Sequence, residues 1–213
     1  MDVPLLEESS ALMDARGKWQ HVGQHRPPFA DSVKDGQESV WDFPRPPRIE
    51  DVTQHLTVKH GDGVIASTHH GIRVLETAGA PTYYFPPSDV DMSTVKAGDV
   101  VSLCEWKGAA QALLIDGIEI GWRYVQMFPA FKDLYLWPSF YPSRIACSVG
   151  TEKVEPQPGG FYGGWVTSTL AGPIKGGPGS DGWRGLSQRL PQQGVLISIP
   201  AGIALRTQML PNV

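Results

Sequence analysis

The dipeptide Asp116-Gly117 divides the stretch VVSLCEWKGAAQALLIDGIEIGWRYVQ (100–126) into two strand-like halves. Asp-Gly favours a two-residue type I′ turn, because both turn residues adopt a positive φ. Such a turn places Ile115 opposite Ile118 and fixes the register of the two strands. One face of the hairpin then carries the residues Ala109, Gln111, Leu113, Ile115, Ile118, Ile120, Trp122 and Tyr124. We predict that this face points into the core, whereas Glu119 and Arg123 face solvent.

Other segments also read as hairpins. HLTVKHGDGVIAST (55–68) alternates around a Gly-Asp-Gly turn, and residues 145–154 fit one more short hairpin. A single core helix is expected from about Ala130 to Tyr135 or Trp137, because Pro138 stops it. The chain contains 24 glycines and 19 prolines, which favours a turn-rich β architecture over a helical one.

The 213 residues suit one domain with extensions at both ends. Residues 1–36 are predicted to form an N-terminal extension, which is polar and proline-broken after a short helix within 5–20. Residues 37–183 are predicted to form the β-domain. Residues 184–213 form a C-terminal extension, which contributes either one more strand or an apolar tail.

Charge and composition exclude several functional classes. The net charge of −4 provides no basic surface for nucleic acid or for an anionic membrane. No apolar run approaches the roughly 18 residues that span a bilayer, and the acidic N-terminus lacks a signal sequence, so a cytoplasmic location is expected. The cysteines, Cys104 and Cys147, are expected to be reduced and largely buried. No metal-ligand pattern occurs, so neither a metal nor another cofactor is expected. A homodimer is left open.

The segment QPGGFYGGWVTSTLAGPIKGGPGSDGW (157–183) combines nine glycines with four large rings. Flexible glycine linkers usually contain serine and few rings, because a coil has nothing to pack against. We therefore expect tight turns whose backbone passes close to another part of the protein or to a ligand, with the rings closing over it.

Strand alternation extends the predicted inward face of the hairpin back to Glu105 and Lys107. A carboxylate and an ammonium that point inward are costly unless they pair or face a cavity. Three interpretations stay open: an internal ion pair at a barrel rim, an acid and a base that face a ligand, or a β-bulge at Gly108 that exposes both side chains.

Rings and cations elsewhere complete a candidate pocket. Lys175 lies in the glycine-rich segment, and Arg45 or Arg73 adds a further cation. In ESVWDFPRPPRIE (38–50) the prolines force an extended strap, which either packs on the domain or covers a pocket with its ring and its arginine. The candidate ligand-binding residues are Trp41, Arg45, Tyr83, Tyr162 and Trp165.

Four blocks of this sequence resemble the family known as domain of unknown function 427, which also carries a nucleotidyltransferase-like label. They are ESVWDFPRPP, VLET followed by YYFPPSDV, CEWKGAA, and the glycine-rich segment, and together they cover residues 38–183. The resemblance implies a mainly β fold: a compact antiparallel β-sandwich or tent-like barrel of hairpins with one short helix. It implies no established activity, and the sequence contains no P-loop that would support phosphate chemistry.

A ring-lined pocket with a few charged groups is typical of a small-molecule site. We expect a cofactor-free acid/base enzyme that isomerises, dehydrates or cyclises a carbon-rich metabolite, as in a biosynthetic isomerase or lyase. Glu105 would be the base, Lys107 and Lys175 would stabilise negative charge, and Tyr83 or Tyr162 would donate a proton. The alternatives are a non-catalytic ligand-binding module and a protein-interaction module that uses the C-terminal tail.

Overall fold

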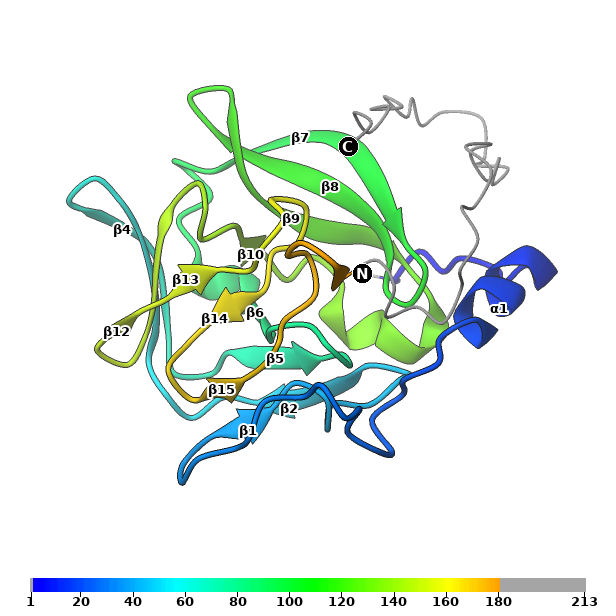
Figure 1. The fold of residues 1–213 in the computed structure, drawn as a ribbon. Helices are drawn as coiled ribbons and strands as arrows, with labels where there is room; N and C mark the ends of the chain where they lie inside the picture. The colour runs from blue at the N-terminus through cyan, green and yellow to red at the C-terminus, as the bar shows by residue number, and fades with distance from the viewer. Residues whose placement is uncertain (1, 181–213) are drawn as a thin grey trace.

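The computed structural model describes residues 2–180 and shows a mainly β fold made of several antiparallel sheets (Figure 1). The predicted fold class is confirmed, and the sheets pack in a sandwich-like manner. Within the described residues, the strands do not close into a barrel.

Five sheets make up the fold. The largest has the order β10-β9-β8-β7, from β7 (Lys96–Cys104), β8 (Gly108–Ile115), β9 (Ile118–Met127) and β10 (Ser139–Phe140). A second has the order β12-β11-β3-β4, from β3 (Leu56–His60), β4 (Gly63–Thr68), β11 (Ala146–Val149) and β12 (Glu152–Lys153). A third has the order β2-β5-β6, from β2 (Arg48–Asp51), β5 (Ile72–Leu75) and β6 (Thr82–Tyr84).

Two short strand pairs and three short helices complete the fold. β13 (Glu155–Pro156) pairs antiparallel with β14 (Trp165–Val166), and β1 (Glu38–Ser39) pairs parallel with β15 (Leu170–Ala171). The helices are α1 (Ser10–Gly17) and the 3₁₀ segments η1 (Pro87–Asp89) and η2 (Pro129–Leu134). The predicted core helix is therefore η2, a 3₁₀ segment that begins one residue earlier than expected and ends at Leu134.

The central hairpin forms at the predicted turn. Asp116 and Gly117 have φ values of 51° and 79°, and Ile115 pairs with Ile118. Trp122 and Tyr124 are buried, as predicted.

The predicted register of this hairpin is wrong beyond the turn, because a β-bulge places one extra residue, Ile120, in β9. Trp122 pairs with Ala112 rather than with Gln111, and Gln111 instead accepts a hydrogen bond from Arg123 on the opposite face (3.0 Å). Ile118, which was expected in the core, is 64% exposed. The bulge changes which residues of β8 accompany each residue of β9 on a given face.

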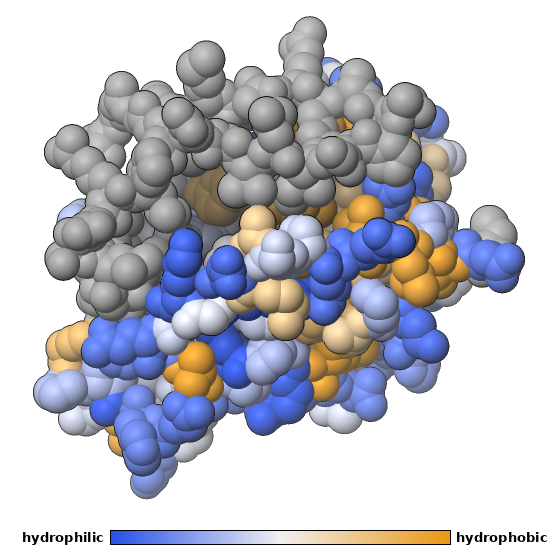
Figure 2. Space-filling view, turned by 90° about the vertical axis from the view of Figure 1, so that its right-hand side faces the viewer, coloured by the Kyte–Doolittle hydropathy of each residue, from blue (hydrophilic) through white to orange (hydrophobic). Residues whose placement is uncertain are grey.

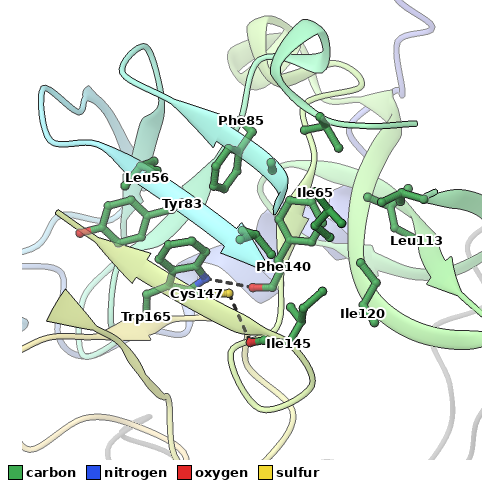
Figure 3. Close-up of a cluster of buried hydrophobic side chains, with 14 of the residues drawn as sticks. Leu56, Ile65, Tyr83, Phe85, Leu113, Ile120, Phe140, Ile145, Cys147 and Trp165 are labelled. Atoms are coloured by element: carbon green, nitrogen blue, oxygen red, sulfur yellow. Dashed lines mark hydrogen bonds between the residues drawn. The ribbon is translucent and has the colours of Figure 1, made fainter. Parts of the chain in front are cut away.

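The bulged hairpin contributes to two hydrophobic clusters. Near the turn, Leu113, Ile115 and Ile120 join β3, β4 and β11 in one cluster, in which Trp165 donates a hydrogen bond to the carbonyl of Phe140 (2.9 Å; Figure 3). Farther from the turn, Trp122 and Tyr124 join a second cluster with β5, β6 and η2. β8 and β9 therefore contribute to both clusters, whereas β7 stays largely exposed.

The predicted N-terminal extension packs on the β-domain. Backbone hydrogen bonds join Leu6 and Pro4 to Met127 on β9 (2.8 and 2.9 Å). The guanidinium of Arg16 on α1 lies over the ring of Trp106 and donates a hydrogen bond to the carbonyl of Glu105 (2.8 Å). The short helix predicted within residues 5–20 is confirmed as α1, whereas residues 184–213 lie outside the described part of the chain.

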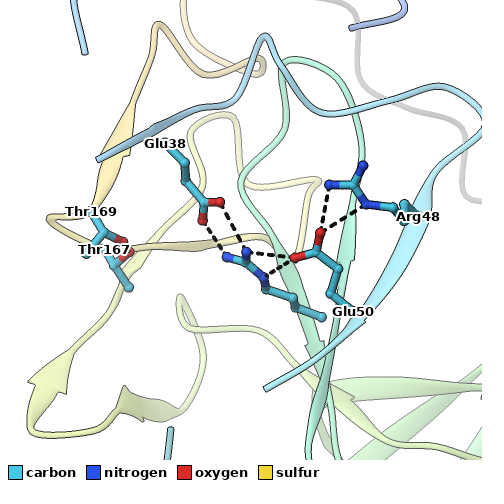
Figure 4. Close-up of polar contacts among 6 residues, drawn as sticks. Glu38, Arg48, Glu50, Thr167 and Thr169 are labelled. Atoms are coloured by element: carbon cyan, nitrogen blue, oxygen red, sulfur yellow. Dashed lines mark hydrogen bonds and ion pairs between the residues drawn. The ribbon is translucent and has the colours of Figure 1, made fainter. Parts of the chain in front are cut away.

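An ion network joins three strands on one side of the fold (Figure 4). Arg73 on β5 pairs with Glu38 on β1 and with Glu50 on β2 (2.8 Å), and Arg48 pairs with Glu50 (2.7 Å). Arg73 was one possible pocket cation in the sequence analysis. In the structure it instead holds β1 against β5 through these ion pairs.

Polar and apolar side chains are mixed on the part of the surface that residues 2–180 form. Figure 2 shows hydrophilic and hydrophobic side chains interspersed on one face. No helix within residues 2–180 is long and apolar enough to cross a membrane. Both cysteines are free thiols; Cys147 is buried, as expected, but Cys104 is only half-buried.

Gly121 provides a test of the close approach between β9 and β10. A Cβ at this position would lie 2.2 Å from the carbonyl oxygen of Ser139, so the backbone would have to shift. We expect Gly121→Ala to lower the free energy of unfolding by about 1–3 kcal/mol, measured by urea denaturation. Gly17→Ala is the matched control, because no atom lies within 4 Å of a Cβ there. Equal stability of both variants would contradict the described β9–β10 contact.

Candidate functional site

A cavity of about 250 Å³ lies where β6, the β7–β8 turn, β9 and the glycine-rich segment meet. Its walls combine rings with a small number of charged groups. The lining residues are Trp19, Val74, Glu76, Gly79, Ala80, Thr82, Tyr84, Ser102, Leu103, Cys104, Glu105, Lys107, Ala110, Trp122, Tyr124, Tyr141, Gln157, Phe161, Tyr162, Gly163, Gly164 and Lys175.

The glycine-rich segment forms one wall by lying directly on a ring. A Cβ at Gly163 would lie only 2.0 Å from the ring of Trp122, so a residue with a side chain cannot approach this closely. Gln157 fixes the segment further, because its side chain accepts a hydrogen bond from the backbone N–H of Ala80 and donates one to the carbonyl of Lys175 (both 3.0 Å). The close backbone approach that the sequence predicted is confirmed.

Three cations converge on one carboxylate, Glu76, which follows β5. Arg45 and Lys175 contact its Oε1 atom (2.8 and 3.0 Å), and Lys107 lies 3.9 Å from Oε2. The side chains of Arg45, Lys107 and Lys175 are 2%, 9% and 13% exposed, so the whole cluster is shielded from bulk water. Buried charges of one sign repel strongly unless a counter-charge lies among them.

The charge state of Glu76 follows from these neighbours. Burial alone would raise the pKa of its carboxyl group, but Lys175, Lys107 and Arg45 outweigh burial and lower the pKa to about 2. Glu76 is therefore ionised at neutral pH and is too weakly basic to take up a proton there. It acts as the counter-charge of the site and not as a base.

Lys107 is a buried cation that faces the cavity. Burial alone would lower its pKa, but Cys104, Tyr84, Glu76 and Glu105 outweigh burial and raise it, so the side chain is an ammonium at neutral pH. Among residues 2–180, its contact with Glu76 at 3.9 Å is too long for a hydrogen bond, and no other polar partner binds the ammonium.

Glu105 and Lys107 reach the cavity from a turn and not from a strand, which corrects the strand-alternation argument. β7 ends at Cys104, which pairs with Gly108, so residues 105–107 form the turn between β7 and β8. The proposed ion pair between Glu105 and Lys107 does not form in the described structure. The Glu105 carboxylate is half-buried and accepts one weak hydrogen bond, from the Cys104 thiol (3.9 Å).

Two phenols line the wall next to this turn. Burial raises the pKa of Tyr84 to about 12, although Lys107 nearby lowers it, and burial also raises the pKa of Tyr124. Both hydroxyls therefore stay protonated at neutral pH and are available as hydrogen-bond donors rather than as anions.

The structure brings together four of the eight residues that the sequence proposed for the site. Glu105, Lys107, Lys175 and Tyr162 all line the cavity, and the Lys175 ammonium lies over the Tyr162 ring (4.9 Å). Arg45 does not line it. Instead Arg45 stands behind the wall, between Glu76 and the ring of Trp19 (3.2 Å).

The other three rings proposed as ligand-binding belong to the core, which corrects that prediction. Trp41, which belongs to the strap, is buried against Phe29 (5.1 Å between ring centroids). Tyr83 and Trp165 pack on each other (4.9 Å) within the cluster of Figure 3. The alternation of β6 explains Tyr83, because its neighbours Thr82 and Tyr84 point to the cavity and Tyr83 points away.

Sequence reasoning missed the residues that organise the cavity, above all Glu76 and Trp19. Glu76 lies within the VLET block and was not singled out, because a lone carboxylate after a strand usually faces solvent. Trp19 comes from the N-terminal extension, and no periodic signal connects it to the β-domain.

Comparison with known families supports the β-domain and adds no activity. Residues 48–151 match a family model described as a domain of unknown function (DUF427), which confirms the resemblance over that segment. The nucleotidyltransferase label is only the name of that model. No curated protein matches the sequence.

Removal of the Glu76 charge tests the cluster. Because Glu76→Gln leaves three buried cations without their counter-charge, we expect the free energy of unfolding at pH 7 to fall by about 3–5 kcal/mol. The folded pKa of about 2 lies below the ordinary 4.5, so this stabilisation is complete above about pH 4.5 and is lost as the pH falls toward 2. The difference between wild type and variant in urea denaturation should therefore narrow over that range.

Glu119→Gln is the matched control for this measurement. Glu119 pairs with Arg144 (2.9 Å), but both side chains are about one third exposed, so its loss should change stability by less than about 1 kcal/mol. A Glu76 variant that behaves like the Glu119 variant would show that the cluster does not stabilise the fold.

Proposed function

We propose that this β-domain binds a small organic molecule in the cavity beside Glu76. The observation that supports this most is the meeting of rings and buried charge in one cavity. The indole of Trp122 and the phenols of Tyr84 and Tyr124 surround a space that Lys107 and Lys175 border. Apolar walls with a few polar groups at fixed positions are the usual composition of a ligand site.

The first candidate activity is acid/base chemistry without a cofactor. Glu105 is the base of this proposal, because it lines the cavity, is half-buried and has no ion pair within residues 2–180. Lys107 and Lys175 would stabilise negative charge that develops on the substrate, and the neutral hydroxyls of Tyr84 and Tyr124 would donate hydrogen bonds to it. Isomerisation, dehydration or cyclisation of a carbon-rich metabolite, in biosynthesis, needs no more than these groups.

The second candidate is a ligand-binding module without chemistry. The low pKa of Glu76 favours it, because this carboxylate, which three cations surround, is a structural counter-charge and not a base. The same cavity then recognises its ligand through rings and charge alone. We further propose a cytoplasmic location, in line with two free thiols, and a small molecule rather than nucleic acid or membrane as the partner. A protein-interaction role and a homodimer are the remaining proposals for partners.

Obstruction of the cavity tests ligand binding. Ser102 lines the cavity and is exposed, so Ser102→Trp should obstruct it without burying a new group. We expect wild-type protein, incubated with a mixture of small metabolites, to retain at least one compound that the variant does not retain. Native mass spectrometry measures this retention. Ser88→Trp, at an exposed position outside the cavity lining, is the control and should retain the same compounds as wild type.

Glu105→Gln separates the two candidate activities. With a retained compound as substrate, an enzyme should lose about 100-fold or more in turnover while it keeps binding, the usual scale for removal of a general base. Chromatography of substrate and product measures turnover, and the melting temperature shows whether the variant is folded. If the wild type converts none of its retained compounds, the binding module is the correct reading.

A further inference from the structure

We propose that the ligand of this cavity is a planar monocarboxylic acid, whose carboxylate binds Lys107 and Lys175 beside Glu76. This inference rests on the proposed ligand site and specifies the chemical class that the site selects. It is carried by the charge of the cavity and by the contacts of Lys107, neither of which depends on the acid/base role of Glu105.

Lys107 supplies the first argument. Its side chain is only 9% exposed, yet its ammonium makes no hydrogen bond with residues 2–180 and lies 3.9 Å from its one ion-pair partner. Burial of an ammonium is costly when its N–H groups are not satisfied. The ammonium faces the cavity, so a negatively charged hydrogen-bond acceptor bound there would satisfy its N–H groups.

The sum of charges gives the second argument. Arg45, Lys107 and Lys175 carry three positive charges, and the carboxylates of Glu76 and Glu105 carry two negative ones, so one positive charge is left over. A monoanion neutralises the site, whereas a dianion such as a phosphate monoester would leave it negative. The Arg45 guanidinium, the group best suited to phosphate, is already held by Glu76, the carbonyl of Thr77 (3.1 Å) and the ring of Trp19.

The shape of the cavity gives the third argument. Its volume of about 250 Å³ is below the roughly 300 Å³ at which sites for drug-sized ligands begin, so the ligand is a small molecule. The rings of Trp19, Trp122 and Tyr162 lie around the same space as the two ammonium groups. Aromatic rings next to a cationic end suit a planar unsaturated body that carries one carboxylate.

Binding of trans-cinnamate and of its neutral amide, cinnamamide, tests the inference. The two probes share a planar body and differ in charge, so their affinity ratio reports the contribution of the carboxylate. We expect wild type to bind cinnamate at least 10-fold more tightly than cinnamamide in ligand-observed NMR titrations. The ratio should fall to near one in Lys107→Met, which keeps the length of the side chain and removes its charge, and should fall as salt is added.

Lys132→Met is the matched control. Lys132 is exposed on η2 and does not line the cavity, so its removal should leave the ratio unchanged. Lys175→Met should lower the ratio as well, and it provides a second variant if Lys107→Met does not fold. Phenyl phosphate serves as a third probe, and its dianion should bind more weakly than cinnamate.

Each contrary outcome has a distinct meaning. Equal affinity for cinnamate and cinnamamide would overturn the anion inference and leave the proposed ligand site standing. Tighter binding of phenyl phosphate would overturn the monoanion count. If neither planar probe binds, the inferred ligand class is wrong, and the retention experiment with Ser102→Trp decides separately whether the cavity binds small molecules at all.

Discussion

The cavity depends on the ion pairs that the Glu76 carboxylate makes with three cations. The three cations that meet it come from separate parts of the chain: the proline-rich strap, the β7–β8 turn and the glycine-rich segment. The strap and the glycine-rich segment are already joined by the β1–β15 pair, and the shared counter-charge links the β7–β8 turn to both. Burial lowers the pKa of Lys107, but Cys104 and Tyr84, followed by Glu76 and Glu105, raise it by more, so the side chain stays an ammonium.

The fold could be predicted where local geometry decides it. The turn requires positive φ at two successive positions, and the dipeptide Asp116-Gly117 is typical of such a turn. The pairing of Ile115 with Ile118 could therefore be predicted. The bulge at Ile120 could not be predicted in this way. It lies next to Gly121, which pairs with Phe140 on β10, a contact between residues about twenty positions apart, and no pattern within β9 reveals it.

The candidate site could be predicted only in part, for a related reason. Lys107 was singled out by strand alternation, although it lies in a turn, and Lys175 by its place in the glycine-rich segment; both line the cavity. Large rings are less informative, since a core of this size needs them as much as a ligand site does. Trp165 is fully buried and donates a hydrogen bond to the carbonyl of Phe140. Its neighbours in the sequence do not show whether it lies in the core or in the cavity.

The cavity is assembled from well beyond the segment that defines the family match. Residues 48–151 include Glu76 and Lys107, but Trp19 and Arg45 precede this segment, and Lys175 follows it. A protein that resembles this one only over the matched segment can share the carboxylate and at most one of its three cations. The ligand of one such protein can be inferred from that of another only when the flanking residues correspond as well. Changes in these flanks can therefore give one scaffold different specificities.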